Sequence, residues 1–106
     1  MKIVLNICYG GFSISEEAAE LMAKNGCIRA KKELEDSKKY GWYGYGYVDG
    51  MDCGYDRTSE HLILAVETLK EKANGSCASL RVIGIPDGID YFIDEYDGIE
   101  SVHVQH

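Results

Sequence analysis

The sequence is poor in positive charge. Its 106 residues include 18 acidic and 11 basic side chains, which gives a formal net charge of −7 at pH 7. Proteins that bind duplex nucleic acid cluster lysine and arginine, because each phosphate contact releases a condensed counterion. The composition therefore argues against duplex nucleic acid as a partner. It leaves two partners open: a small anion in one local basic pocket, or a protein whose nucleic-acid groove the acidic surface occupies.

Long hydrophobic runs are also absent, and we expect no signal peptide. A membrane helix needs about 20 consecutive apolar residues, and the apolar runs here are only a few residues long. The first two residues lead directly into a strand pattern without a hydrophobic signal region. We therefore expect a cytoplasmic protein without a membrane partner. A chain of this length builds one core, so we predict a single domain, 1–106, with self-association as a close alternative.

Cysteine and histidine lack the spacing of a metal site. The four cysteines form no C-x-x-C pair and the three histidines show no ligand spacing beside them. We therefore predict no metal and no cofactor. Cys8, Ser13 and Ser15 lie near a glycine turn, but every histidine is far away in the sequence, so the chain offers no convincing nucleophile. We expect no catalytic residue and no enzyme activity.

Hydrophobic periodicity predicts a small α+β domain, with helices packed on one face of a mostly antiparallel sheet. A capping box of Ser13 and Glu16 is expected to start the first helix, and Asp97-Gly98 indicates a hairpin turn. The expected strands cover 2–8, 80–85, 89–96 and 99–104. The expected helices cover 16–25 and 28–39, with a third that is capped by Thr58 or Ser59 and ended by Asn74-Gly75.

Residues 40–55 alternate glycine with aromatic residues. The stretch YGWYGYGYVDGMDCGY contains five tyrosines and the only tryptophan, and glycines this dense favour neither helix nor strand. We therefore expect a loop insert. Amphipathic rings cover a core, form a dimer contact, or stack on a nucleobase. Covering or dimer contact is the simpler interpretation, and the stacking hypothesis selects Trp42 and Tyr43.

The start of the chain has the order of an anion-binding turn. A buried strand runs through Gly10, Gly11 and Phe12 into a helix start, an arrangement in which backbone N–H groups face an anion. The lysine of a P-loop and the third glycine of a dinucleotide fingerprint are missing. A plain tight turn is therefore the simpler interpretation, and a phosphate held by these three residues is the functional hypothesis.

Arg57 stands alone among carboxylates, just before a helix start. Its simplest role is an ion pair with a neighbouring acid. The candidates are Asp52, Asp56 and Glu60. Its functional role is a planar fork for the phosphate at the glycine turn. Arg29 and Arg81 are alternatives for that role.

Six acidic side chains are concentrated in the last predicted hairpin. They are Asp87, Asp90, Asp94, Glu95, Asp97 and Glu100. Such acids usually form a solvated face that protects a sheet edge from pairing. Two functional hypotheses compete with this interpretation. Asp94 with Glu95 binds a ribose diol or a divalent metal, or the whole surface imitates a phosphate backbone.

Three segments of the chain resemble a family of small phage and prophage proteins. They are KIVLNICYGGFSIS, YDRTSEHLILAVETLKEKANG and IPDGIDYFIDEYDGIESVH, and the family has an insert of variable length where this chain has residues 27–55. Small phage proteins of this type are often counter-defence factors, and the chain is similar to the sponges that sequester the cyclic ADP-ribose signals of Thoeris immunity. The resemblance implies a homo-oligomer with a β-sheet core that binds the nucleotide between protomers, in the host cytoplasm, without cleaving it.

The residues and the resemblance together predict a phage counter-defence protein that sequesters a nucleotide-derived signal, of the cyclic ADP-ribose type or a cyclic oligonucleotide. In this hypothesis Gly10, Gly11 and Phe12 hold a phosphate. Arg57 pairs with that phosphate, and Trp42 or Tyr43 stacks on the base. The alternative is an acidic protein-binding inhibitor of a host defence nuclease, such as a CRISPR effector, that acts through the hairpin.

Overall fold

A computed structural model describes residues 1–48 and 54–104 of the chain. The elements in chain order are β1 (Lys2–Asn6), α1 (Glu16–Lys24), α2 (Ile28–Tyr40), α3 (Glu60–Leu69), the short 3-10 helix η1 (Lys70–Ala73), β2 (Leu80–Gly84), β3 (Tyr91–Tyr96) and β4 (Ile99–Val104). The predicted α+β domain is confirmed. Residues 49–53 of the predicted aromatic loop, which include Asp52 and Cys53, lie outside the described residues.

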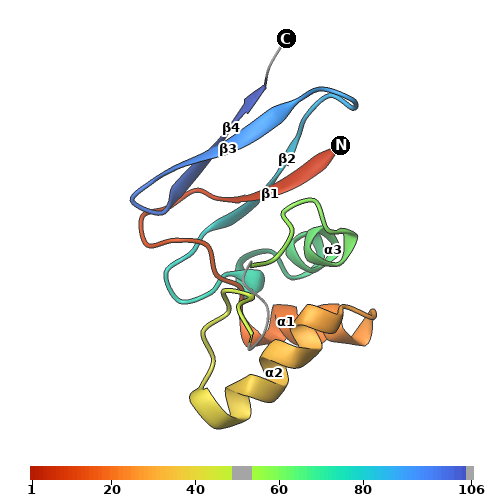
Figure 1. Ribbon diagram of the computed structural model, residues 1–106, viewed down its shortest axis with the longest axis vertical. Helices are drawn as coiled ribbons and strands as arrows, with labels where there is room; N and C mark the ends of the chain where they lie inside the picture. The colour runs from red at the N-terminus through yellow and green to blue at the C-terminus, as the bar shows by residue number, and fades with distance from the viewer. Residues whose placement is uncertain (49–53, 105–106) are drawn as a thin grey trace.

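The domain is built in layers on a central pair of strands, β1 and β2 (Figure 1). Successive side chains of a strand face opposite sides. Ile3 and Leu5 therefore face the β3–β4 hairpin, where they pack near Ile93 and Val102. Val4 faces the other side and belongs to the core formed with the helices. Both faces of this short strand are thus buried, which explains why its three central residues, 3–5, are all apolar.

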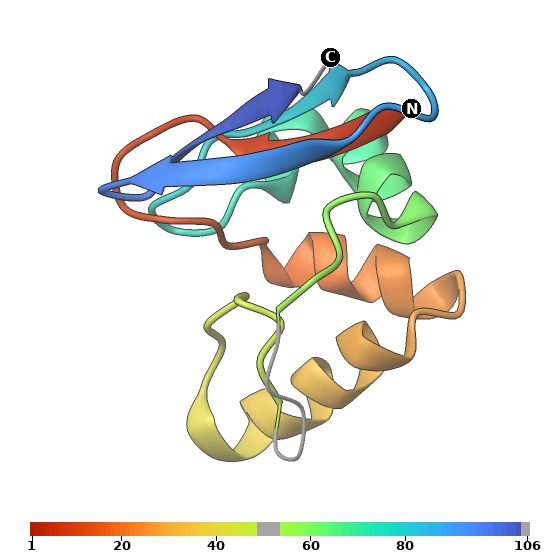
Figure 2. The ribbon, with the colours of Figure 1, turned by 45° about the horizontal axis from the view of Figure 1, so that its top comes forward.

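The four strands form two separate antiparallel pairs rather than one sheet. In the central pair Val4 lies opposite Val82, and in the hairpin Ile93 lies opposite Val102. Figure 2 shows the hairpin on one side of the central pair and the helices on the other. The prediction of helices on one face is therefore confirmed, and the hairpin covers the second face as a small sandwich layer.

The helices stack outward from the central pair of strands. α3 contacts β1 and β2, α1 contacts α3, and α2 packs on α1 as the outermost layer. α1 buries Ala18, Ala19 and Met22, whereas α2 buries only Ala30 and Glu33. The other residues of α2 are exposed or half-buried. Among the described helices, none is long and apolar enough to cross a membrane.

The cap of the first helix is not the predicted one. Ser15 has an extended backbone and accepts a hydrogen bond from the Ala18 N–H at 3.1 Å. Ser13 is buried instead, and its carbonyl accepts the Gly75 N–H at 3.0 Å. The predicted capping box of Ser13 and Glu16 is therefore wrong. Ser13 and Ser15 both precede acidic residues, so either could cap the helix by sequence alone. The tertiary contact of Ser13 with Gly75 leaves Ser15 as the cap.

Element ends elsewhere differ from the predictions by a few residues. The first strand ends at Asn6 rather than Cys8, because Asn6 turns its side chain into a hydrogen-bond network. The third helix ends at Leu69 and continues as the 3-10 turn η1. Such differences at frayed or tightened ends are common.

The tip of the hairpin packs on the glycine turn that follows β1. Asp97 and Gly98 both have positive φ, 50° and 92°, as a two-residue hairpin turn requires. The Asp97 carbonyl accepts the Gly10 N–H at 3.2 Å. A Cβ on Gly98 would lie 2.3 Å from the Gly11 nitrogen, so no side chain fits there. The hairpin tip and the glycine turn are one packed unit.

This packing predicts different costs for two glycine substitutions. Gly88→Ala places a Cβ in open space at a φ of 74°, and we expect it to lower the free energy of unfolding by about 1 kcal/mol through backbone strain alone. Gly98→Ala has similar strain and also overlaps the glycine turn, so we expect about 3 kcal/mol. Urea unfolding measures both. Equal decreases in the free energy of unfolding for the two variants would contradict the tight packing of the hairpin tip.

Candidate functional site

A pocket of about 430 Å³ lies where the glycine turn, the hairpin and the aromatic loop meet. We call it the glycine pocket. Four of the six predicted ligand-binding residues line it, namely Gly10, Gly11, Phe12 and Arg57. They come from two segments about 45 residues apart in the sequence. The structure therefore brings the predicted anion-binding turn and the predicted arginine to one site.

Arg57 is held in the pocket by two contacts. Its guanidinium lies over the Phe12 ring, 3.7 Å from the ring centroid, and its Nη1 donates to Glu100 Oε1. The side chain of Arg57 is 22% exposed and that of Glu100 is 9% exposed. The predicted ion pair of Arg57 therefore forms, but its partner is Glu100 on β4 rather than the sequence neighbours Asp56 or Glu60.

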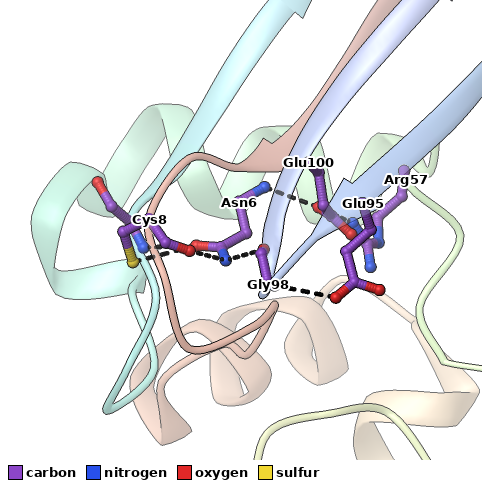
Figure 3. Close-up of polar contacts among 7 residues, drawn as sticks. Asn6, Cys8, Arg57, Glu95, Gly98 and Glu100 are labelled. Carbon is purple, nitrogen blue, oxygen red and sulfur yellow. Dashed lines mark hydrogen bonds and ion pairs between the residues drawn. The ribbon is translucent and has the colours of Figure 1, made fainter.

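Asn6 fixes the position of the hairpin relative to β1, as Figure 3 shows. The residue is fully buried. Its Nδ2 donates to the carbonyls of Cys8 at 2.9 Å and Gly98 at 2.7 Å, and its Oδ1 accepts the Ser79 N–H at 2.8 Å. Its backbone N–H donates to Glu100 Oε1 at 2.8 Å. Asn6 was not selected from the sequence, since one polar residue at the end of an apolar strand carries no distinctive signal.

The glycine turn offers fewer amides to an anion than its sequence indicates. The Gly10 N–H is already bonded to the Asp97 carbonyl, and Gly98 packs against the Gly11 nitrogen. α1 begins only at Glu16, so its N-terminus does not follow the turn directly. The φ values of Gly10 and Gly11, 125° and 106°, confirm a tight turn that needs glycine. Phosphate binding by this turn stays a prediction.

The pocket contains a pair of carboxylates, but not the predicted pair. Asp94 and Glu95 are neighbours on β3 and face opposite sides of the strand. Glu95 lines the pocket together with Glu100, which lies directly opposite it in the register of β3 and β4. Glu95 Oε1 also accepts the Gly98 N–H at 2.9 Å. Two acceptor groups therefore stand beside the Arg57 donor, a combination that suits hydroxyl groups as well as an anion.

Trp42 and Tyr43 do not line the glycine pocket. Trp42 Nε1 donates to the Ile14 carbonyl at 3.1 Å and its ring packs against the helix core, so Trp42 covers the core. Tyr43 faces a different pocket. The loop rings that line the glycine pocket are Tyr45, Tyr47 and Tyr55, of which Tyr45 and Tyr47 are exposed and Tyr55 is buried. The alternation of glycine with aromatic residues does not show which ring faces which side, so the sequence could not separate them.

Tyr55 and Glu33 anchor the aromatic loop to α2. The Tyr55 hydroxyl donates to Glu33 Oε1, and Glu33 Oε2 accepts the Gly46 N–H at 2.7 Å. Arg29 donates to the Gly46 carbonyl at 2.9 Å. Burial raises the pKa of Glu33 above its usual 4.5, and burial together with the Glu33 carboxylate raises the pKa of Tyr55 above 10. Sequence reasoning missed Glu33, because acids in a charged helix are normally exposed.

No family model, curated protein or solved structure matches the chain. In residues 1–48 and 54–104, no group of three or more His, Cys, Asp or Glu side chains is placed to hold a metal ion. The chemistry of the pocket residues is therefore the basis for a functional proposal.

The raised pKa of Glu33 predicts a pH dependence of stability. The folded state retains the Glu33 proton to higher pH than the unfolded state, so this residue's contribution to stability falls as pH rises above 4.5. Glu33→Gln removes the titration. We expect the free energy of unfolding of the native protein, relative to that of Glu33→Gln, to decrease as pH rises from 4.5 toward neutrality.

Urea unfolding at a series of pH values measures this difference. Glu35→Gln is the matched control, since Glu35 is exposed on the same helix. The free energy of unfolding of Glu35→Gln should change with pH in parallel with that of the native protein. If the free energy of unfolding of the native protein rises with pH over this range, relative to that of Glu33→Gln, the prediction is contradicted.

Proposed function

We propose that the protein is a phage counter-defence factor that binds and sequesters a nucleotide-derived immune signal in the host cytoplasm without cleaving it. The signal is of the cyclic ADP-ribose type or a cyclic oligonucleotide. The observation that carries the proposal is the glycine pocket, where Arg57 and the glycine turn meet beside aromatic rings. Its volume of about 430 Å³ falls within the usual range of small-molecule sites, about 300–1,000 Å³.

Each part of a nucleotide has a matching group in this pocket. The rings of Tyr45 and Tyr47 offer stacking surfaces for a base, in place of the predicted Trp42 and Tyr43. Glu95 accepts hydrogen bonds from ribose hydroxyls. Arg57 donates to a phosphate.

A phosphate shares Arg57 with Glu100. The guanidinium has five N–H donors in a planar fork, and the bond to Glu100 uses Nη1. The glycine turn allows a ligand to approach the backbone closely, since Gly10 and Gly11 carry no side chain. Binding at this site therefore needs no rearrangement of the buried ion pair.

Sequestration is proposed rather than turnover because the pocket carboxylates are already engaged. Glu95 accepts the Gly98 N–H, and Glu100 accepts both the Asn6 N–H and Arg57. In the proposal these carboxylates position the ligand. We include homo-oligomerisation in the proposal, since a second protomer over the pocket would bury rings that are largely exposed in one chain.

Thermal unfolding with a panel of signals tests the proposal. Cyclic ADP-ribose isomers and cyclic di- and trinucleotides are added one at a time, and the small molecule is recovered after heat denaturation. We expect one compound to raise the melting temperature, as mass action requires, and to return unchanged. A compound that returns altered would show an enzyme instead. No shift with any compound would contradict signal binding.

Arg57→Lys locates the bound signal. This variant keeps the charge and the ion pair with Glu100 but loses the planar fork, so we expect the affinity for the signal to fall about tenfold or more. Arg81→Lys makes the same change on the exposed surface of β2, away from the glycine pocket, and should bind as the native protein does. Isothermal titration measures both affinities. Equal affinities for the two variants would show that Arg57 does not contact the signal.

The outer face of the hairpin supports a second candidate, an acidic inhibitor of a host defence nuclease such as a CRISPR effector. Phe92 and Tyr96 are 48% and 74% exposed on the same face of β3 as Asp94, and protein interfaces are enriched in aromatic residues. Replacing both Asp90 and Asp94 by lysine separates the candidates. A sponge keeps its full thermal shift with the signal, whereas an inhibitor loses its effect on nuclease cleavage.

A further inference from the structure

We propose that a second pocket, between α2 and the aromatic loop, binds a small quaternary ammonium cation. The pocket has a volume of about 520 Å³, and we call it the tyrosine pocket. Its lining includes Glu33, Asp36, Tyr40, Tyr43, Tyr45 and Tyr47. Tyr40 and Tyr43 line this pocket and not the glycine pocket. Tyr45 and Tyr47 line both pockets, so Tyr40 and Tyr43 are the rings that test this proposal separately from the function proposed for the glycine pocket.

The tyrosine rings are the first observation that points to a cation. All four of the rings that line the tyrosine pocket are at least 45% exposed, so core packing does not account for their position. The face of an aromatic ring carries partial negative charge and attracts a cation within about 6 Å of the ring centroid. The four rings line one concave site, with Tyr43 and Tyr45 stacked on each other at a centroid distance of 6.3 Å. In the proposal these rings form a cage for positive charge.

The charges around the site are the second observation. The carboxylates of Glu33 and Asp36 belong to the lining, and its described residues include no lysine or arginine. Lys39 lies beside the pocket with its Nζ 5.1 Å from the centroid of the Tyr40 ring. One ring of the cage thus already holds a cation of the chain itself. The glycine pocket differs, because Arg57 provides a positive group there.

The loop that carries Tyr43, Tyr45 and Tyr47 is anchored to α2 at Gly46. Gly46 lies between Tyr45 and Tyr47, and its peptide groups are held on both sides, since Glu33 accepts its N–H and Arg29 donates to its carbonyl. A site that is ordered in advance loses little conformational entropy on binding. This anchoring favours a specific cage over a set of independently moving surface rings.

The chemistry of the lining selects a quaternary ammonium over a primary one. A primary ammonium has three N–H donors and needs acceptors that replace its water. The Glu33 oxygens already accept from Tyr55 and Gly46. A methylated cation has no N–H donor and pairs well with aromatic faces, as in the recognition of choline and methyl-lysine.

Choline and its neutral isostere 3,3-dimethylbutan-1-ol test the proposal on the native protein. The two molecules have the same shape, but only choline is charged. We follow the ring protons of the tyrosines by NMR during each titration. We expect saturable binding of choline and at least tenfold weaker binding of the alcohol. Equal binding of both, or none of choline, would overturn the proposal.

Two leucine variants assign the binding to the tyrosine pocket. Tyr43→Leu keeps an apolar side chain but removes one cage ring, and we expect at least a fivefold loss of choline affinity. Tyr96→Leu is the control, since Tyr96 is exposed on β3 and lines neither pocket. Tyr40→Leu repeats the test at a second cage ring. Native choline affinity in both Tyr43→Leu and Tyr40→Leu would place the cation elsewhere and overturn the proposal.

Loss of choline binding in these variants is separable from failure of the nucleotide proposal. Tyr43 does not line the glycine pocket, so Tyr43→Leu should retain any thermal shift caused by a nucleotide signal. Conversely, Arg57→Lys changes the glycine pocket alone and should leave choline binding at its native value.

Discussion

The buried side chain of Asn6 is the interaction on which the arrangement of this small domain depends. It joins the end of β1 to the hairpin through the carbonyl of Gly98, and to the residue before β2 through the N–H of Ser79. A buried amide stabilises a structure only when its donors and its acceptor are satisfied, and here all are. The position of the hairpin, and with it that of Glu95 and Glu100, follows from this one residue.

The guanidinium of Arg57 offsets the repulsion between two carboxylates of the hairpin. Glu95 and Glu100 are directly opposite on neighbouring strands, and like charges in such positions destabilise a sheet. Arg57 offsets this repulsion from outside the hairpin, and its guanidinium lies over the Phe12 ring. The two pockets therefore differ in charge. The glycine pocket contains the positive charge of Arg57. In the lining described for the tyrosine pocket, the ionisable groups besides tyrosine are all acidic.

The elements of this fold were predictable because each depends on local sequence. Helical spacing of apolar residues identified α1 and α3, and Asp97-Gly98 identified the hairpin turn. Contacts between distant segments were not predictable. The pairing of Arg57 with Glu100 spans 43 residues, and no local pattern distinguishes Glu100 from the exposed acids around it.

The candidate site was also predictable only where it depends on local sequence. The glycine turn and Arg57 were found from local signals, namely clustered glycines and an isolated arginine among acids. The choice of rings failed, since Trp42 is used as a core cover and Tyr45 takes a place in the pocket. The hypothesis that Asp94 and Glu95 act as a pair disagrees with strand geometry, because neighbouring residues of a strand face opposite sides.

The pairing of β1 with β2 has a consequence for how the chain acquires its structure. Lys2 lies opposite Gly84 and Asn6 opposite Leu80, so β1 leaves the ribosome more than 70 residues before its partner strand is synthesised. Contacts of such long sequence separation slow folding, because a large loop must close before they form. During this interval the apolar faces of β1 are uncovered, which makes the nascent chain a candidate for chaperone binding.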